Sequence, residues 1–299
     1  MKGFKRVKKP IWAHTTVAGT YSNTPLRFNH PAYLHTTIRF LIFVTLSFFS
    51  LSAFSLPPFW TQGKQVSSSS GLSDEVDVCT LGDKIYVVWS DNRTGNREIF
   101  FISSQDAGQS WSREERLTDT SGESTQPAIA CDRESIYLVW REKTEKTSDI
   151  YYKKWDGEPW SNSILLSEGY ENSRRPDVAT TSVQAGSRVY AVWDSTGDGR
   201  TIAYMVESTD GGRSFSKPQP ITEGTWDTKE PVVWGGARDA YLAWVDNREG
   251  NWNVFFRRWG EVQMGPEIKL SPMPDCSSPA ISGEEPQIYV AWQCVEKDV

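Results

Sequence analysis

A five-residue pattern that recurs about every fifty residues constrains the fold of this chain more than any other feature. Each copy is an apolar run with tyrosine in second place and tryptophan in last place. The copies IYVVW, IYLVW, VYAVW, AYLAW and IYVAW end at Trp89, Trp140, Trp193, Trp244 and Trp292, at intervals of 51, 53, 51 and 48 residues. A repeat of this length is typical of solenoids and propellers, whose units bury their apolar faces only against one another.

Each repeat contains short runs with the composition of β-strands. An apolar run such as PAIAC precedes the tyrosine–tryptophan run, and a polar loop separates the latter from a third run such as DIYYKKW. A last run leads to RLTD, LLSEG, PITEG or KLSP. Short runs divided by turn residues predict an antiparallel blade, and no helical periodicity competes with them. The sequence therefore predicts an all-β propeller of about five four-stranded antiparallel blades, with repeats at about 74–120, 121–170, 171–223, 224–273 and 274–299.

The last repeat stops after its second predicted strand, at QCVEKDV. The segment FWTQGKQVSSSSG, residues 59–71, is similar to the end of a repeat such as WSREERLTDTSG. In one alternative, this N-terminal segment supplies an outer strand to the final blade and closes the ring, which hides the sheet edges. Otherwise, either the ring is a small five-bladed one with an incomplete last blade, or the chain is a truncated fragment of a larger propeller protein.

The N-terminal region differs in charge from the rest of the chain. All 38 Asp and Glu lie at or after Asp74, whereas eight of the 32 Lys and Arg precede it. An uncharged apolar run spans residues 40–56 and is slightly short for a membrane-spanning helix of roughly 20 residues. We interpret residues 1–56 as a basic leader with a signal peptide, or alternatively with an uncleaved membrane anchor, and residues 57–299 as the propeller.

Either alternative exports the body, which is then secreted, periplasmic or anchored at the outer face of a membrane. The acidic balance of the body argues against nonspecific nucleic-acid binding, which depends on Lys and Arg. All three histidines, His14, His30 and His35, precede the apolar run. A body without histidine cannot form a Ser-His-Asp triad or a His-ligated zinc site, so no metal site of that kind is expected.

The four cysteines lie in the exported part of the chain, where disulfides can form. Cys276 and Cys294 flank a predicted hairpin, and pairing Ser282 with Ile288 would place them opposite each other, so we predict a disulfide between them. The other two, Cys79 and Cys131, occupy nearly matching places in successive repeats, and we interpret them as buried thiols.

An octet, SQDAGQSW at residues 104–111, returns as STDGGRSF at residues 208–215. In each copy, an aspartate can accept hydrogen bonds from turn amides, a glycine permits positive φ, and the final aromatic residue can pack between blades. These properties favour a structural role. The residues that we assign to this role are Ser104, Asp106, Gly108, Trp111, Ser208, Asp210, Gly212 and Phe215.

The octets resemble the Asp-box, or BNR repeat, of the sialidase-like β-propellers, and the resemblance covers roughly residues 59–299. It implies that each octet joins the third and fourth strands of a blade. It also implies that ligands bind at the opposite face, which is built from the loops after the tyrosine–tryptophan strands and from the links between blades.

Charged residues follow the tryptophans in these loops, and two loops share the pattern DNRxGN. One interpretation is a turn in which Asp and Arg pair, and the alternative is a mouth of carboxylates and guanidiniums suited to a carboxylated sugar. Asp and Asn oxygens also suit calcium, and no other cofactor is expected. The candidate ligand-binding residues are Asp91, Arg93, Glu142, Arg174, Arg175, Asp194, Asp246 and Arg248.

The resemblance further implies that an enzyme of this kind would clamp a substrate carboxylate with three arginines and use a tyrosine nucleophile. The nearest match to the first arginine motif is SRRP, residues 173–176, which assigns that role to Arg174 but lacks the aromatic residue and the isoleucine of the motif. We therefore expect a noncatalytic module that binds a glycan or protein ligand. The alternative is a sialidase-like glycoside hydrolase that uses carboxylates and arginines.

Overall fold

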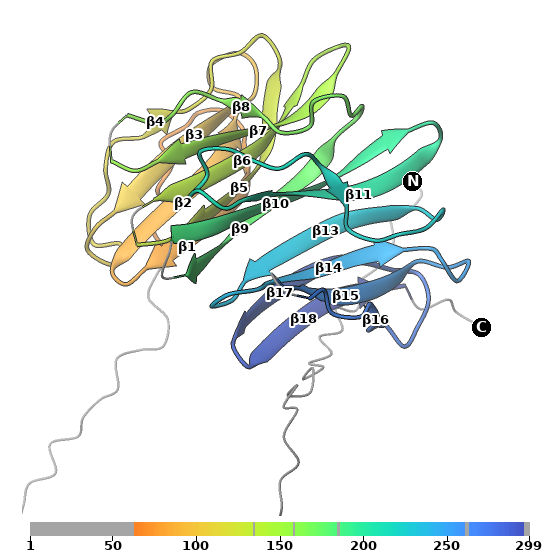
Figure 1. The fold of residues 1–299 in the computed structure, drawn as a ribbon. Coiled ribbons are helices and arrows are strands. Elements are labelled where there is room, and N and C mark those ends of the chain that lie inside the picture. The colour runs from red at the N-terminus through yellow and green to blue at the C-terminus, as the bar shows by residue number, and fades with distance from the viewer. Residues whose placement is uncertain (1–62, 134, 158, 184–185, 261–262, 296–299) are drawn as a thin grey trace, which may run out of the picture. The chain divides into compact units, whose positions relative to one another are not determined.

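The computed structural model describes residues 63–295, except for 134, 158, 184–185 and 261–262. The regular elements of this part are all β-strands (Figure 1). The predicted leader, residues 1–56, lies outside the described residues. Within them, no helix has the length and apolar character needed to cross a membrane.

The first two sheets are four-stranded antiparallel meanders in which each strand pairs with the next in sequence. The first sheet contains β1 (Ser73–Leu81), β2 (Lys84–Asp91), β3 (Glu98–Ser104) and β4 (Glu115–Arg116). The second contains β5 (Glu123–Cys131), β6 (Ile136–Lys143), β7 (Ser148–Trp155) and β8 (Ile164–Leu165).

The next two sheets have the same order of strands, and the last is shorter. The third sheet contains β9 (Arg174–Val183), β10 (Gly186–Gly197), β11 (Arg200–Ser208) and β12 (Gln219–Pro220). The fourth contains β13 (Thr228–Gly235), β14 (Ala240–Asp246), β15 (Asn253–Trp259) and β16 (Ile268–Lys269). The fifth contains β17 (Cys276–Glu284) and β18 (Gln287–Cys294).

The predicted all-β fold of four-stranded antiparallel sheets is confirmed, although only two strands of the fifth sheet are described. Residues 66–72 form no strand in that sheet. They contact the first sheet instead: Ser69 Oγ donates to Asp91 Oδ1 at 3.0 Å, and the carbonyl of Leu72 accepts from the amide of Asn92 at 3.3 Å.

The tryptophans of the repeat explain why each sheet folds alike. In the four four-stranded sheets, each lies opposite an aromatic residue of the following strand, with ring centroids 5.8–6.3 Å apart. The pairs are Trp89–Phe100, Trp140–Tyr151, Trp193–Tyr204 and Trp244–Phe255. Apolar clusters fill the spaces between successive sheets, and the first strand of each sheet contacts the first strand of the next. The core therefore consists of layers between neighbouring sheets.

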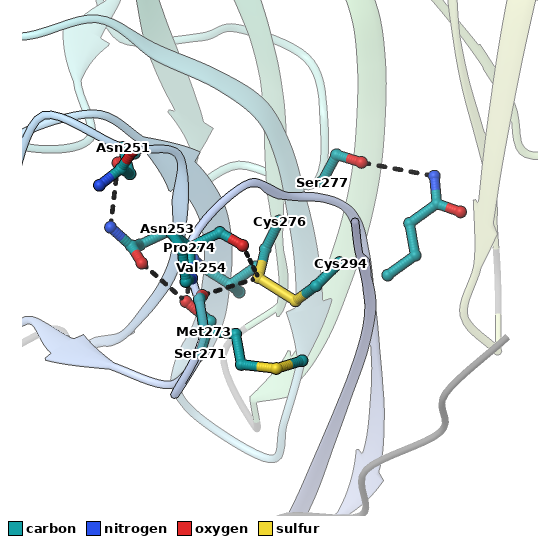
Figure 2. Close-up of a disulfide and its surroundings, with 10 residues drawn as sticks. Asn251, Asn253, Val254, Ser271, Met273, Pro274, Cys276, Ser277 and Cys294 are labelled. Carbon is teal, nitrogen blue, oxygen red and sulfur yellow. Dashed lines mark hydrogen bonds between the residues drawn. A yellow bond between two sulfur atoms is a disulfide. The ribbon is translucent and has the colours of Figure 1, made fainter. Parts of the chain in front are cut away.

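A disulfide joins Cys276 to Cys294 at the open end of the last hairpin, where the Cys276 sulfur lies 3.1 Å from the carbonyl oxygen of Met273 (Figure 2). The expected register near the turn is wrong by one residue, because Ser282 pairs with Tyr289. A β-bulge between Ser277 and Ala280 shifts the register back, since a bulge inserts one extra residue into one strand. The cysteines therefore still face each other.

The interpretation of the other two cysteines as thiols is wrong. Cys79 in β1 and Cys131 in β5 form a disulfide, with their Cα atoms 6.0 Å apart. Matching positions in successive repeats become neighbours because the first strands of the two sheets lie side by side. The bond therefore joins the first sheet to the second covalently.

Candidate functional site

The loops after the second strands and the octet turns lie at opposite ends of the sheets. In the first sheet, Ile85 pairs with Ser104 at one end and Asp91 pairs with Glu98 at the other. The amide of Ala107 in the octet donates to the carbonyl of Asp83, between β1 and β2, at 2.8 Å. We call the end formed by the loops after β2, β6, β10 and β14 the mouth.

Both octets form turns closed by their own side chains. Ser104 Oγ accepts from the amide of Gly108 at 2.8 Å, and Asp106 accepts from the amide and the hydroxyl of Ser110 at 2.8 and 2.6 Å. The hydrogen bonds from Ser110 hold the pKa of Asp106 at about 2. The second octet has the same contacts from Ser208 and Asp210, and the hydroxyl of Ser214 likewise lowers the pKa of Asp210.

The aromatic residues that end the octets differ in their surroundings. Phe215 packs edge-on against Tyr152 of the second sheet, with ring centroids 4.8 Å apart, and so lies between two sheets as expected. Trp111 instead joins an apolar cluster made of residues from its own sheet. The two octets therefore share their hydrogen bonds but not their packing.

The two DNRxGN loops form closed networks. Asp91 is fully buried and accepts from Ser69, Ser73 and Arg93 at 2.6–3.0 Å. Arg93 also pairs with Glu114, and its guanidinium lies 4.4 Å from the centroid of Phe100. Burial opposes ionisation of Asp91, but the hydrogen bonds outweigh burial and hold its pKa far below the usual range.

The fourth sheet repeats this arrangement. Asp246 is fully buried, and Arg248 binds it at 2.6 Å, pairs with Glu267 and lies 4.1 Å from the centroid of Phe255. In the second sheet, Glu142 is buried without an arginine and accepts from the hydroxyls of Thr120 and Ser124, each at 2.6 Å. In the first and second sheets the acid thus binds hydroxyls of the preceding segment, whereas among the described residues the side chain of Asp246 binds only Trp244 and Arg248.

The third sheet departs from this pattern. Asp194 follows Trp193 by one residue instead of two, and Ser195 takes the indole hydrogen bond at 3.2 Å. Because side chains alternate across a strand, Asp194 points to the other face. There it accepts from Nε of Arg174 at 2.8 Å, from Nε of Arg175 at 2.7 Å, and from the amide of Glu230 at 3.0 Å.

Arg141, which the sequence analysis missed, belongs to the same face of the mouth. It follows Trp140 by one residue, as Asp194 follows Trp193, and this offset is the signal that could have found it. Its Nε donates to Ser148 Oγ at 2.7 Å, and its terminal nitrogens have no partner among the described residues. Burial, followed by the charge of Arg174, lowers the pKa of Arg141. An anion placed here would offset both effects.

The first strands carry a strained position beside this cluster. Each has one non-glycine residue with φ of 52–54° at a β-bulge, and such residues cost about 1–3 kcal/mol and gather at functional sites. These residues are Glu75, Gln126, Arg175, Glu230 and Ser278. Three of their side chains accept a hydrogen bond from the backbone amide of the corresponding residue in the next sheet. Glu75 accepts from Gln126, Gln126 accepts from Arg175, and Glu230 accepts from Ser278. Arg175 cannot accept, so Asp194 accepts from Glu230 in its place.

Two further carboxylates, also missed, lie on the first strands. Asp77 Oδ2 accepts from the amide of Ile129 at 2.7 Å, and Asp177 Oδ2 accepts from the amide of Val233 at 2.8 Å. Burial raises the pKa of Asp177 to about 7, and the charge of Asp77 adds to this shift. The described residues contain no group of three or more His, Cys, Asp and Glu side chains placed to hold a metal ion.

No protein-family model matches this sequence, and a search of curated proteins gives no match. Solved structures show similar folds. Trypanosoma rangeli sialidase in complex with sialic acid matches with a TM-score of 0.51 and 11% identity over 73% of this chain and 42% of that chain. The same sialidase with the inhibitor DANA gives a TM-score of 0.52 and 10% identity over 74% and 43% of the two chains. A subtype N10 neuraminidase-like protein of A/little yellow-shouldered bat/Guatemala/060/2010 gives 0.46 and 12% over 69% and 62%.

The two sialidase structures show that this chain has a sialidase-like fold. The chain spans about two fifths of the length of that sialidase. The shared feature is the fold, since the residues that perform a function are placed on a fold independently of it.

Proposed function

We propose that this protein is an exported propeller of the sialidase-like type that binds a carboxylated glycan at the mouth without cleaving it. The observation that carries the proposal is the half-buried guanidinium of Arg141, which has no acidic partner among the described residues and lies near Arg174. Guanidinium groups bind carboxylates through paired, charge-assisted hydrogen bonds.

Exposure supports the assignment of Arg174 and Arg175 to the same site. Their side chains are 39% and 34% exposed, compared with 19% for Arg93 and for Arg248. Asp194 binds Nε of both arginines and also Nη2 of Arg175, and Nη1 of Arg175 lies 3.5 Å from Glu230. Nη2 of Arg174 donates to Thr196 at 3.3 Å, whereas its Nη1 has no partner among the described residues. A ligand carboxylate can therefore reach Nη1 of Arg174 without breaking an ion pair. Export is supported by the two disulfides, which persist in oxidising compartments.

A noncatalytic role is supported by the tyrosines of the repeat. Burial raises the pKa of Tyr137 and Tyr241, and it raises that of Tyr190 to about 12. A tyrosine nucleophile requires the opposite shift, because the ionised form is the one that attacks.

The test compares binding of the methyl glycoside of sialic acid with binding of its methyl ester, which lacks the charge. We expect the purified protein to bind the acid and not the ester in calorimetry. Arg141→Ala should weaken binding about tenfold or more, because hydrogen bonds to charged groups contribute roughly 1.5–3 kcal/mol. The matched control is Arg213→Ala, an exposed arginine at the octet end, which should bind as the unchanged protein does. Equal binding of acid and ester, or full affinity in Arg141→Ala, would refute the proposal.

One observation favours a glycoside hydrolase as the second candidate. Asp177 has a pKa of about 7, raised by burial and also by the negative charge of Asp77. A carboxyl group with a raised pKa can act as a general acid beside a second carboxylate. Hydrolysis of a fluorogenic sialoside, measured beside Arg174→Ala and Asp177→Asn, decides between the candidates. Turnover that is lost in both variants would establish the hydrolase, and no turnover from folded protein would exclude sialidase activity.

A further inference from the structure

A groove of about 540 Å³ lies between the third and fourth sheets, and Arg141, Arg174 and Arg175 are not among its lining residues. Residues of β11 and β12 line one side of the groove, and residues of β15 line the other. Figure 1 labels β11 and β15. The link that joins β12 to β13 crosses its base. Its volume is within the range of small-molecule sites, roughly 300–1,000 Å³.

The link at this groove departs from the links of the other sheets. In those sheets, the hydroxyl of the second residue after the outermost strand accepts from an amide of the third strand: Thr118 from Ile99, Ser167 from Ile150 and Ser271 from Val254. In the third sheet, Ala203 donates instead to Thr228 of the fourth sheet at 2.7 Å. The hydroxyl of Thr222, which is freed by this change, donates to Glu267 at 2.6 Å. The groove therefore lies where the repeat is broken.

The base of the groove is apolar and built around Trp226. A Cβ atom at Gly224, where φ is +145°, would overlap the six-membered ring of Trp226, so only glycine allows this position. Trp259, Pro220 and Met264 complete the apolar surface. The indole Nε1 of Trp226 is buried and has no hydrogen-bond partner among the described residues, although buried tryptophan N–H groups usually have one.

Three planar polar groups lie on the rim: the guanidinium of Arg200, the amide of Gln219 and the carboxylate of Glu223. All three residues are exposed, and none of their side chains has an intramolecular hydrogen bond or ion pair within the described part of the chain. The charges of Arg200 and Glu223 balance each other, and the third charged residue that lines the groove, Arg257, pairs with Glu267 at 3.4 Å. The groups without an ion-pair partner therefore offer paired donors and paired acceptors whose charges sum to zero.

We propose that this groove binds a neutral hexopyranose unit of a glycan, as a site distinct from the cluster of Arg141, Arg174 and Arg175. The mouth loop after β14 contacts the groove only through Arg248, whose guanidinium lies 4.6 Å from the centroid of the Trp226 ring. A pyranose ring presents apolar C–H faces and pairs of neighbouring hydroxyls, which match the apolar base and the planar polar groups of the rim. A ligand with a net charge would leave either Arg200 or Glu223 uncompensated.

The experiment measures binding of lactose, maltotetraose and cellotetraose to the full protein by ligand-observed NMR and calorimetry. We expect at least one of them to bind, and Arg200→Ala combined with Glu223→Ala to weaken it about tenfold or more. Both side chains are exposed and unpaired, so the variant should fold. The control is Glu168→Ala, an exposed glutamate at the matching position of the preceding link, which should leave binding unchanged.

Three results would overturn the assignment. In the first, none of the three oligosaccharides binds. In the second, binding persists in the rim variant but is lost in Arg141→Ala, which would place the sugar at the mouth. In the third, a tetraproline peptide binds in a way that depends on the rim while the sugars do not, which would make the groove a peptide site. The proposed function is tested with a charged sugar and Arg141→Ala, whereas the groove is tested with neutral sugars and the rim variant. Either proposal can therefore fail while the other holds.

Discussion

The mouth loops of the first and fourth sheets differ from that of the third in how their charges are used. In the first and fourth, one buried aspartate, one arginine and one glutamate close a network that also covers an aromatic ring. In the third, one buried aspartate holds two arginines and an amide of the next sheet. The DNRxGN motif, which recurs at the same offset from the tryptophan, therefore stabilises the loops, whereas the third sheet, where the acid is offset by one residue, holds more exposed arginines.

The largest expected effect comes from Asp194→Ala. This change leaves two guanidiniums and the amide of Glu230 without their acceptor, and breaking a buried ion pair costs about 3–5 kcal/mol. We expect a loss near the lower end of that range in the free energy of unfolding, measured with urea, because Arg174 and Arg175 can turn to solvent. A loss below about 1 kcal/mol would show that the third mouth loop does not depend on this carboxylate.

The octet end offers a matched pair with the same sequence pattern and different neighbours. Both glycines have φ near +80°, but a Cβ atom at Gly212 would overlap the hydroxyl of Tyr152, whereas one at Gly108 meets only ordinary contacts at 3.6 Å and beyond. We expect Gly212→Ala to cost about 3 kcal/mol, from overpacking and the left-handed backbone together. Gly108→Ala should cost about 1–2 kcal/mol, from the backbone alone. If thermal or urea unfolding shows the same loss of stability in both variants, then the contact of the second octet with Tyr152 of the second sheet does not restrict position 212.

Asp177 gives a prediction for the dependence of stability on pH. Its pKa of about 7 in the folded state is above the unfolded value, so between about pH 4 and 7 the folded protein binds a proton that the unfolded chain has released. This contribution to stability is therefore lost as the pH rises through that window. We expect the free energy of unfolding of Asp177→Asn to fall less between pH 5 and pH 7.5 than that of the unchanged protein. Parallel profiles would show that another group titrates.

The smallest effect on stability is expected at the spare arginine. Arg141→Ala removes one hydrogen bond to Ser148 and should cost at most about 1 kcal/mol. Arg248→Ala removes two ion pairs and a ring contact and leaves Asp246 with only the Trp244 indole and one backbone amide as donors among the described residues, so it should cost about 1–2 kcal/mol more. If the two variants unfold at the same urea concentration, the contrast between saturated and spare arginines is wrong.

The sequence predicted the strands and their antiparallel order well, because the period of the tyrosine–tryptophan run and the turn residues between runs are local signals. The hairpin of Cys276 and Cys294 was also anticipated, but the register near its turn was not, since a bulge leaves little trace in composition. The bond between Cys79 and Cys131 could not be derived locally, because it joins two sheets.

The candidate site was predicted only in part. Arg174, Arg175 and Asp194 were identified together with residues that the structure places in closed networks, and the sequence alone did not separate the two groups. Arg141 and Asp177 were overlooked, since each lies in a segment that otherwise follows the repeat.

By itself, the sequence determined the length of the repeat, the strands within it and the turns that end them, because these depend on neighbours within a few residues. The tertiary structure decided which charges meet. An offset of one residue after the tryptophan turns Asp194 and Arg141 to the opposite face of their strands from Asp91 and Asp246. On that face Asp194 meets Arg174 of the first strand of its own sheet, 20 residues earlier, and the amide of Glu230 of the next sheet, 36 residues later.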